Sequence, residues 1–356
     1  MPIDLKYIAG LIDKVEGAAS GKDAKVDFWL PSGNYALNRA ISGDYFKGLP
    51  FGRVIEVFGD PSTGKSLLMY HWIAEVQKMG GIAILDDPED AYTEKFGKLL
   101  GIDNDAIIML NSLTVEEHFE KVFLGWRKKG KEGEEGKKKM GLVDLIWEKD
   151  TECPILICLD SLALLSTRHE QAVQLDKADM SKAKQIRSAL RNSASYMRRG
   201  RIMHVVANHV TSKIGVVFGN PKTTPGGTGI PFSASVRLEL TYGGKLKDVD
   251  NTDKVIGVMA TAKGSKNKVA APFQEAHLDI YFDKGVDPLS GLFESLLVNG
   301  ILKQALKDDG TEKKGYFDIF GEQLRKGEFN EFIKKNISKL SSVKTKEDPK
   351  SNPKTP

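Results

Sequence analysis

The chain has 356 residues, of which 40% are hydrophobic and 28% are charged, and its formal net charge at pH 7 is +4. This composition is ordinary for a folded protein with one large core and a small satellite domain. The small net charge excludes nucleic-acid binding by overall attraction, so any such binding has to come from local patches. No apolar run approaches membrane-spanning length, and the N-terminal residues lack the apolar core of a signal peptide. We therefore expect a cytoplasmic protein without a membrane partner.

The N-terminal residues 1–30 form a unit of their own. Residues 3–17 place apolar side chains on one face, which predicts a short amphipathic helix, and a linker follows it. This helix can dock on its own core or on a neighbouring subunit, and the sequence pattern does not choose between them.

From residue 53 the pattern alternates between apolar strands and helical stretches. This alternation predicts an α/β fold whose central, mostly parallel sheet is buried on both faces. The apolar runs are VIEVF (54–58), IAILD (82–86), ILICLD (155–160) and IMHVVA (202–207).

A phosphate-binding motif, G-x-x-x-x-G-K-[ST], lies between the first of these strands and a helical stretch. Its glycines let backbone N–H groups close around phosphates at a helix N-terminus. We expect Lys65 to reach the β- and γ-phosphates of ATP, and the Ser66 hydroxyl to ligate Mg²⁺. The motif comprises Gly59, Asp60, Pro61, Ser62, Thr63, Gly64, Lys65 and Ser66.

Acidic residues follow two other predicted strands at the same edge of the sheet. Asp160 ends the run 155–160, where a carboxylate can hold Mg²⁺ beside the phosphate loop, although a strand-end Asp taken alone is more often a turn former. The cluster 86–90, DDPED, offers four carboxylates to orient the water that attacks ATP. The number of charges alone does not tell which of these four carboxylates orients the water.

Three further segments lie outside the alternating pattern. Residues 127–149 contain an insert whose charged, Gly-broken part, 127–139, is either a solvated loop or an auxiliary patch for nucleic acid or a partner. Residues 285–340 predict a small C-terminal α+β domain. The Lys-, Ser- and Pro-rich residues 341–356 predict a disordered tail.

The stretch 208–227, NHVTSKIGVVFGNPKTTPGG, loses all hydrophobic periodicity after its strand. It carries Lys213 and Lys222 with Phe218 between them, and a basic loop with an aromatic suits a nucleic-acid backbone. Composition alone favours an ordinary surface loop. However, KIGVVFGNPKTTPGG at 213–227 resembles the second DNA-binding loop of the RecA recombinases, and blocks at 33–59, 231–240 and 263–280 resemble that family in the same order.

The resemblance spans about residues 26–298, without the insert. It implies a P-loop RecA-like ATPase core at residues 31–284, with DNA loops near 167–180 and 210–229. It also implies a homo-oligomeric helical filament on single-stranded DNA that uses ATP and Mg²⁺ and pairs its strand with homologous double-stranded DNA, in recombination and repair. A single-strand-binding protein and a loading mediator would be further partners, although the sequence identifies neither.

Individual roles follow only from this resemblance. Asp87-Pro88-Glu89 reproduces the family's Asp-x-Glu, which makes Glu89 the water-activating residue. Phe96 would stack on adenine, or else be a core aromatic. Lys266 and Lys268 would act in trans on the neighbour's ATP, where composition alone favours a solvated turn. Phe232 would lie at the subunit interface, or else pack in the core. The residues assigned to DNA binding are Met180, Lys213, Ile214, Val217, Phe218, Gly226 and Gly227.

His209 departs from the bacterial pattern. Bacterial RecA proteins typically carry Gln there, and His resembles the T4-type phage recombinases of the UvsX kind. We interpret His209 as a sensor of the γ-phosphate. Two rival functions remain. A RecA-fold hexameric helicase would not be expected to carry GNPKTTPGG at 219–227 or KNK at 266–268. The other is an ATP-binding regulatory assembly, against which Lys65, Ser66, Glu89 and Asp160 argue.

Overall fold

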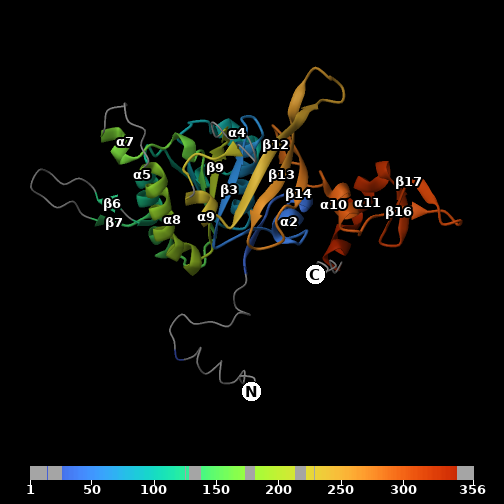
Figure 1. Ribbon diagram of the computed structural model, residues 1–356, viewed down its shortest axis with the longest axis horizontal. Coiled ribbons are helices and arrows are strands. Elements are labelled where there is room, and N and C mark those ends of the chain that lie inside the picture. Colours follow the sequence, from blue (N-terminus) through green and yellow to red (C-terminus); the bar gives the residue numbers. More distant parts are fainter. Residues whose placement is uncertain are drawn as a thin grey trace, which may run out of the picture.

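The computed structural model describes residue 14 and residues 26–124, 126–127, 138–172, 181–212, 222–227 and 229–342. Its main body is a nine-stranded sheet of order β15-β14-β13-β12-β3-β9-β8-β4-β5 (Figure 1). The strands are β3 Arg53–Gly59, β4 Ile82–Asp86, β5 Ile107–Leu110, β8 Ile155–Leu159, β9 Ile202–His209, β12 Val236–Lys247, β13 Val255–Asn267, β14 Glu275–Tyr281 and β15 Gly285–Val286.

The sheet has a parallel half and an antiparallel half. Pairing is parallel from β12 through β3, β9, β8 and β4 to β5, and antiparallel from β12 to β15. The four apolar runs of the sequence are β3, β4, β8 and β9, whose residues are almost all buried. The predicted α/β class with a central, mostly parallel sheet is therefore confirmed.

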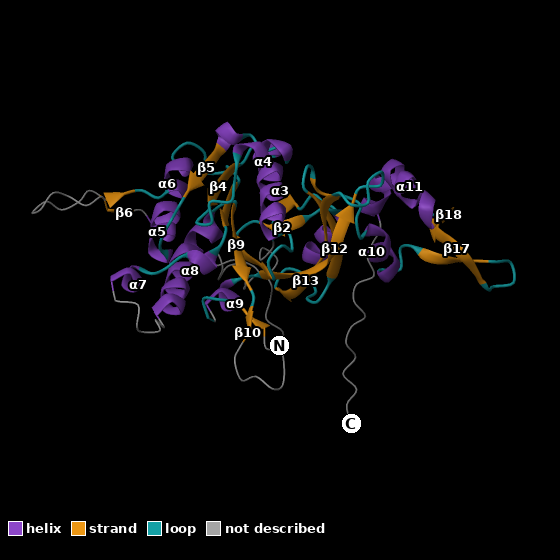
Figure 2. Ribbon diagram, turned by 90° about the horizontal axis from the view of Figure 1, so that it is seen from above, coloured by secondary structure: helices purple, strands orange, loops and turns teal. Residues whose placement is uncertain are grey.

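Helices cover both faces of the parallel half, and successive strand residues face opposite helical layers (Figure 2). Along β3, Ile55 and Val57 pack with the layer of α2 and α3, whereas Val54 packs with the layer of α5, α6, α8 and α9. The helices are α2 Tyr35–Ser42, α3 Lys65–Lys78, α4 Glu94–Leu99, α5 Val115–Phe119, α6 Leu142–Trp147, α7 Arg168–Ala172, α8 Ser181–Arg199 and α9 Gly229–Ser233.

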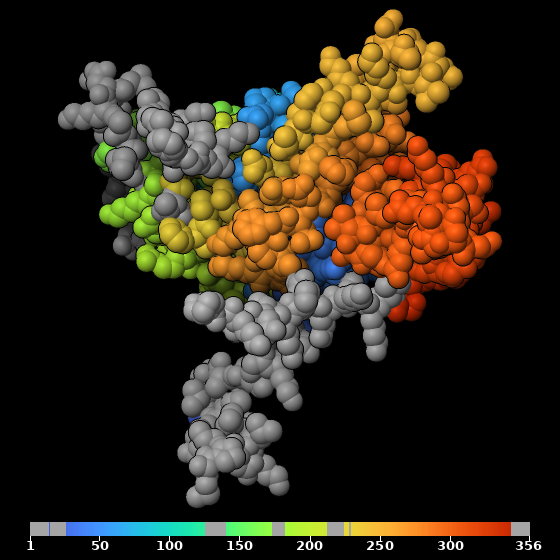
Figure 3. Space-filling model, turned by 45° about the vertical axis from the view of Figure 1, so that its right-hand side comes forward, coloured from blue at the N-terminus to red at the C-terminus, as the bar shows by residue number. Residues whose placement is uncertain are grey.

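The C-terminal residues form a separate lobe with its own small core (Figure 3). Phe293 packs edge-on against Phe317 and Phe329, and these rings are sealed by aliphatic side chains. The lobe comprises α10 Leu292–Val298, the antiparallel strands β16 Lys303–Leu306, β17 Glu312–Ile319 and β18 Glu322–Arg325, and α11 Phe329–Asn336. This small sheet matches the predicted α+β character, while the exact domain boundaries remain predictions.

Short strand pairs complete the described chain: β1 Trp29–Pro31 with β2 Gly48–Pro50, β6 Trp126–Arg127 with β7 Lys138–Lys139, and β10 Thr211–Ser212 with β11 Lys222–Thr223. The predicted N-terminal helix and nearly all of the predicted tail lie outside the described residues, as do residues 128–137 of the charged insert. Across the described ranges, no helix is long and apolar enough to cross a membrane.

Candidate functional site

The phosphate loop joins the carboxyl end of β3 to the first turn of α3. Gly64 lies just before α3 with φ +90°, a left-handed conformation that a residue with a side chain adopts only under strain. The Lys65 ammonium is buried and donates to the carbonyl oxygens of Gly59 at 3.1 Å and Asp60 at 2.9 Å. Burial lowers the Lys65 pKa, against the opposing effect of the nearby carboxylates. A cation and a helix N-terminus thus point into one loop, which is the arrangement that binds phosphates.

Asp160 lies directly after β8, beside the first turn of α3. The nearby Ser66 hydroxyl favours its charged form, and its Oδ2 is buried without a hydrogen-bond partner in the described part of the chain. Burial, reinforced by the nearby Glu89 and Asp87 carboxylates, raises the Asp160 pKa to about 6. A hydroxyl and a carboxylate with an unpaired oxygen are ligands that Mg²⁺ accepts, so these two residues fit the ion.

The structure separates the carboxylates of the acidic cluster by their contacts. Asp86 is fully buried and bonded to His118 Nδ1 at 2.7 Å. Asp87 Oδ2 accepts the backbone N–H groups of residues 91 and 92, so it shapes the loop itself. Asp90 is exposed. Of the four carboxylates, only Glu89 lines the pocket beside the phosphate loop. This position favours Glu89 as the carboxylate that orients the attacking water.

Two hydrogen bonds hold the Glu89 carboxylate in place. Ser161 Oγ donates to Glu89 Oε1 at 2.9 Å, and His209 Nε2 lies 3.3 Å from the same oxygen. His209 is the last residue of β9, and the segment assigned to DNA begins directly after it. A carboxylate suited to polarise water therefore contacts the residue from which that segment departs.

These groups surround one pocket of about 480 Å³, within the usual size range of small-molecule sites. Phe96, on α4, lines it together with Tyr70 of α3, and the two rings meet edge to face with centroids 5.9 Å apart. Val258 and Phe282, from the antiparallel half, close the pocket. Its lining comprises Pro61, Ser62, Gly64, Lys65, Ser66, Leu67, Tyr70, Glu89, Ala91, Phe96, Asp160, His209, Val258 and Phe282.

Asn208, just before the segment assigned to DNA, contacts both the buried Glu56 carboxylate and the far end of that segment. Asn208 Nδ2 donates to Glu56 Oε1 at 3.1 Å and to the carbonyl of Pro225 at 3.0 Å. Arg237 forms an ion pair with Glu56 and covers the Phe58 ring. Glu56 is fully buried, so removing Arg237 would leave its charge without a compensating cation.

The assigned DNA-binding residues Gly226 and Gly227 have positive φ and turn the chain against α8. A Cβ on either glycine would lie 2.9 Å from a side-chain carbon of Ile186 or Ala183, so only glycine fits there. The remaining assigned residues, Met180, Lys213, Ile214, Val217 and Phe218, lie outside the described residues.

Lys266 and Lys268 lie at the amino edge of the parallel strands, opposite the phosphate loop. In the sheet, Lys266 of β13 lies opposite Arg237 of β12, which in turn lies opposite Glu56 of β3. The Lys266 ammonium donates to the carbonyls of residues 231 and 232. Phe232 is 71% exposed at this edge, which excludes core packing for it. The structure thus separates these three residues from the pocket that holds Glu89 and Lys65.

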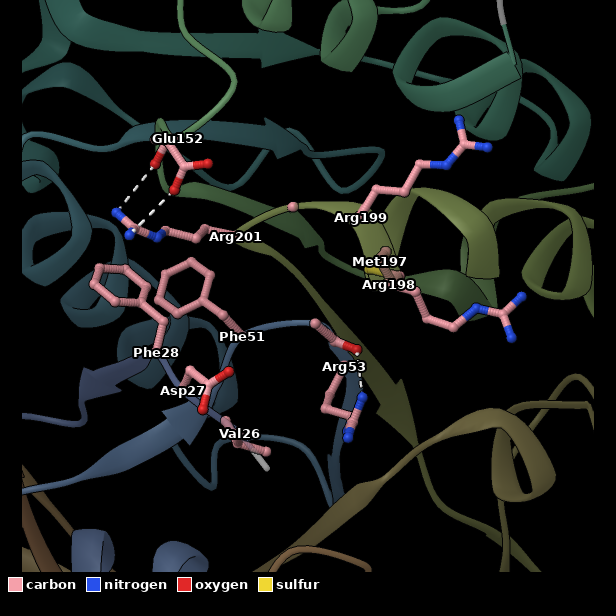
Figure 4. A pocket seen from close by; sticks show the side chains of 12 residues that line it. Val26, Asp27, Phe28, Phe51, Arg53, Glu152, Met197, Arg198, Arg199 and Arg201 are labelled. Carbon is pink, nitrogen blue, oxygen red and sulfur yellow. Dashed lines mark hydrogen bonds and ion pairs between the residues drawn. The ribbon is translucent and has the colours of Figure 1, made fainter. Parts of the chain in front are cut away.

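The same edge is rich in arginine. Arg53, Arg191 and Arg198 line a groove together with Phe232 and Lys268. A neighbouring pocket shares Arg53 and Arg198 and adds Arg199 and Arg201 (Figure 4). In it, Arg201 pairs with Glu152 at 3.2 Å and covers the Phe28 ring. The carboxyl edge of the sheet therefore carries the acidic cluster, and the amino edge carries a basic groove.

Several residues at the site were not singled out from the sequence. Glu56 interrupts an apolar strand, and a charge in such a run could have marked a buried ion pair. Arg237 lies within the resembling block 231–240, but no local pattern pairs it with Glu56. His118 and His204 meet Asp86 only through the fold, from positions far apart in the chain.

Comparison with known proteins agrees with this geometry. The family model for the RecA N-terminal domain matches residues 3–122 and 132–287. Protein RecA 1 of Myxococcus xanthus is 34% identical over 91% of this chain and 84% of its own length. Protein RecA of Tropheryma whipplei is 31% identical over 97% of this chain and 70% of its own, and that of Thermus thermophilus 31% over 89% and 84%. The chain belongs to the RecA family of ATP-dependent DNA recombinases.

Proposed function

We propose that ATP, bound between adjacent subunits of this recombinase, controls how tightly its filament binds single-stranded DNA. The contact between Glu89 and His209 carries the proposal, because it joins the water-activating group to the start of the DNA segment. The filament would then pair its bound strand with a homologous duplex. Base pairing between the DNA strands would provide the sequence recognition.

Each pocket residue has a role in this proposal. The phosphates of ATP would replace the carbonyls of Gly59 and Asp60 as acceptors for the Lys65 ammonium. Ser66 and Asp160 would hold Mg²⁺, which supplies positive charge to the phosphate oxygens when bound. Glu89 would accept a proton from the attacking water while Ser161 and His209 fix its orientation. Phe96 would cover the adenine.

The two edges of the sheet support a head-to-tail assembly. Lys266 and Lys268 lie too far from their own phosphate loop, because Lys266 lies at the level of Glu56, about 10 Å along the strands from Gly59. They would instead meet the ATP of a neighbouring subunit, whose acidic carboxyl edge complements the basic groove beside Phe232. A heterologous contact whose rotation does not close into a ring repeats along an axis and would generate a helical filament.

Electron microscopy of the purified protein tests this proposal. The protein is imaged on long single-stranded DNA with Mg²⁺ and a slowly hydrolysed ATP analogue, with Lys65→Ala as the control. We expect a continuous helical coat for the native chain and its loss for the variant. Separate rings on largely bare DNA would contradict the proposal and point to a helicase-type assembly.

A further inference from the structure

Three fully buried polar side chains form a hydrogen-bonded chain below the carboxyl edge of the sheet. Asp86 Oδ2 lies 2.7 Å from His118 Nδ1, and His118 Nε2 lies 3.2 Å from His204 Nε2. All three residues have no exposed surface. Polar groups buried in an apolar layer cost free energy unless they are paired, so the chain is a specific arrangement.

The contacts of this chain are satisfied when both histidine rings are neutral. Burial holds the pKa of His204 well below its usual value, so this ring is neutral. Its Nε2–H can then donate to His118 Nε2, and His118 Nδ1–H can donate to Asp86. The backbone N–H of Ser112 donates to the other oxygen of Asp86 at 2.8 Å. His118 is thereby fixed between β4 and β9.

The two strands joined by His118 end at the nucleotide pocket. Asp86 is the last residue of β4 and precedes the loop that bears Glu89, and its carbonyl oxygen accepts the backbone N–H of Asp160 at 2.9 Å. His204 lies on β9, which ends at His209. A displacement of either strand would therefore change the hydrogen bonds of His118 on α5.

The opposite side of α5 contacts the start of the first predicted DNA loop, 167–180. The backbone of Val115 donates to the carbonyl of Ser166 at 2.9 Å. Both terminal nitrogens of Arg168 bond to the Glu120 carboxylate, at 2.8 and 2.6 Å, and Arg168 N donates to Glu116 at 3.3 Å. Figures 1 and 2 both show α7, which begins at Arg168, beside α5.

We propose that α5 couples the nucleotide pocket to the first DNA loop. His118 is the positioning residue on its inner side. Glu120, the residue directly after α5, bonds to Arg168 at the start of the loop. This inference rests on the proposed function, because it takes residues 167–180 as a DNA loop. It adds a second connection to the one that runs from Glu89 through His209.

The outer contact is tested first, because Glu120 is at the surface and its removal is compatible with folding. Surface ion pairs contribute about 0–1 kcal/mol, so Glu120→Gln should fold normally. We expect its ATP hydrolysis without DNA to match the native chain, while the stimulation by single-stranded DNA falls about fivefold or more. Glu275→Gln, which removes the similar ion pair with Lys263 on β13 and β14, is the matched control and should leave the stimulation unchanged.

The inner contact is tested with His118→Asn. The Asn amide can still donate to Asp86 from a position close to Nδ1, but it is too short to reach His204. We expect an unchanged KM for ATP and a lower DNA-stimulated kcat, which a merely structural role would not separate. In the double variant with Glu120→Gln, the effect should not exceed that of the stronger single change, because both changes interrupt one connection.

The outcomes distinguish this inference from the function on which it rests. A native chain whose ATP hydrolysis does not respond to single-stranded DNA would overturn both. A native chain that responds, together with a Glu120→Gln variant that responds equally, would overturn the coupling alone. Effects of the two changes that multiply independently would also overturn it.

Discussion

Replacing Asp160 by Asn should stabilise the ligand-free protein at neutral pH. The fold raises the pKa of this carboxyl from 3.8 to about 6, because burial and two neighbouring carboxylates disfavour its charge. The side chain is only 2% exposed, so solvent screens little of this effect. A rise of about two pKa units corresponds to about 3 kcal/mol.

The sign of the pH dependence follows from the two pKa values. Below pH 3.8 the carboxyl is protonated in both the folded and the unfolded chain, and it changes nothing. Between pH 3.8 and 6 the unfolded chain ionises first, so the free energy of unfolding falls as the pH rises. Above pH 6 the full cost of about 3 kcal/mol is present. The amide of the Asp160→Asn variant does not ionise, so the variant should avoid this cost.

The assay is urea unfolding of both proteins at pH 5, 6 and 7.5, followed by circular dichroism. The difference between the two proteins isolates Asp160 from other titrating groups, and it should grow with pH toward about 3 kcal/mol in favour of the variant. MgATP should stabilise the native chain more than the variant, since the variant would lose one of the two proposed ligands of the ion. A variant that is less stable at pH 7.5, or a difference independent of pH, would refute the reasoning.

Three further predictions concern other parts of the site. Glu89→Gln should retain ATP binding but lower the hydrolysis rate about 10²- to 10⁴-fold, as measured by equilibrium binding and single-turnover hydrolysis; near-native turnover would assign the proton acceptor elsewhere. His209→Ala should leave ATP binding unchanged and lower the stimulation of hydrolysis by single-stranded DNA, because it removes the contact with Glu89; an unchanged stimulation would remove the sensor role from the imidazole. Arg198→Glu should reverse charge in the groove beside Phe232 and raise the protein concentration needed to coat single-stranded DNA, most strongly at low salt; an equal requirement for both proteins would exclude the groove from the subunit contact.

The parts of the fold that depend on short sequence segments could be predicted. The strands β3, β4, β8 and β9 are buried on both faces and therefore read as continuous apolar runs. The phosphate loop and Asp160 follow directly from the ends of two of them. By contrast, β5 is only four residues long and mostly half-buried, so the sequence offers little apolar signal for it.

The parts that depend on contacts between distant segments could not be predicted. Four neighbouring carboxylates look alike in the sequence, and only their contacts in the fold separate them, such as those of Asp86 with His118 and of Glu89 with Ser161. The position of Lys266 opposite the phosphate loop follows from the antiparallel pairing of β12 and β13. In the C-terminal lobe, Gly300 turns the chain with φ +69° between α10 and β16, residues 303–306.

The central claim is that each ATP site is completed by a neighbouring subunit, and mixing two inactive variants tests it most directly. One variant is Lys65→Ala, which loses its own phosphate contact, and the other carries Lys266→Ala and Lys268→Ala. Each alone should hydrolyse little ATP on single-stranded DNA. In an equimolar mixture, about a quarter of the junctions should combine an intact phosphate loop with intact lysines, and activity should recover in that proportion. Lysines that served the ATP of their own subunit would leave the mixture inactive, and that result would contradict the account.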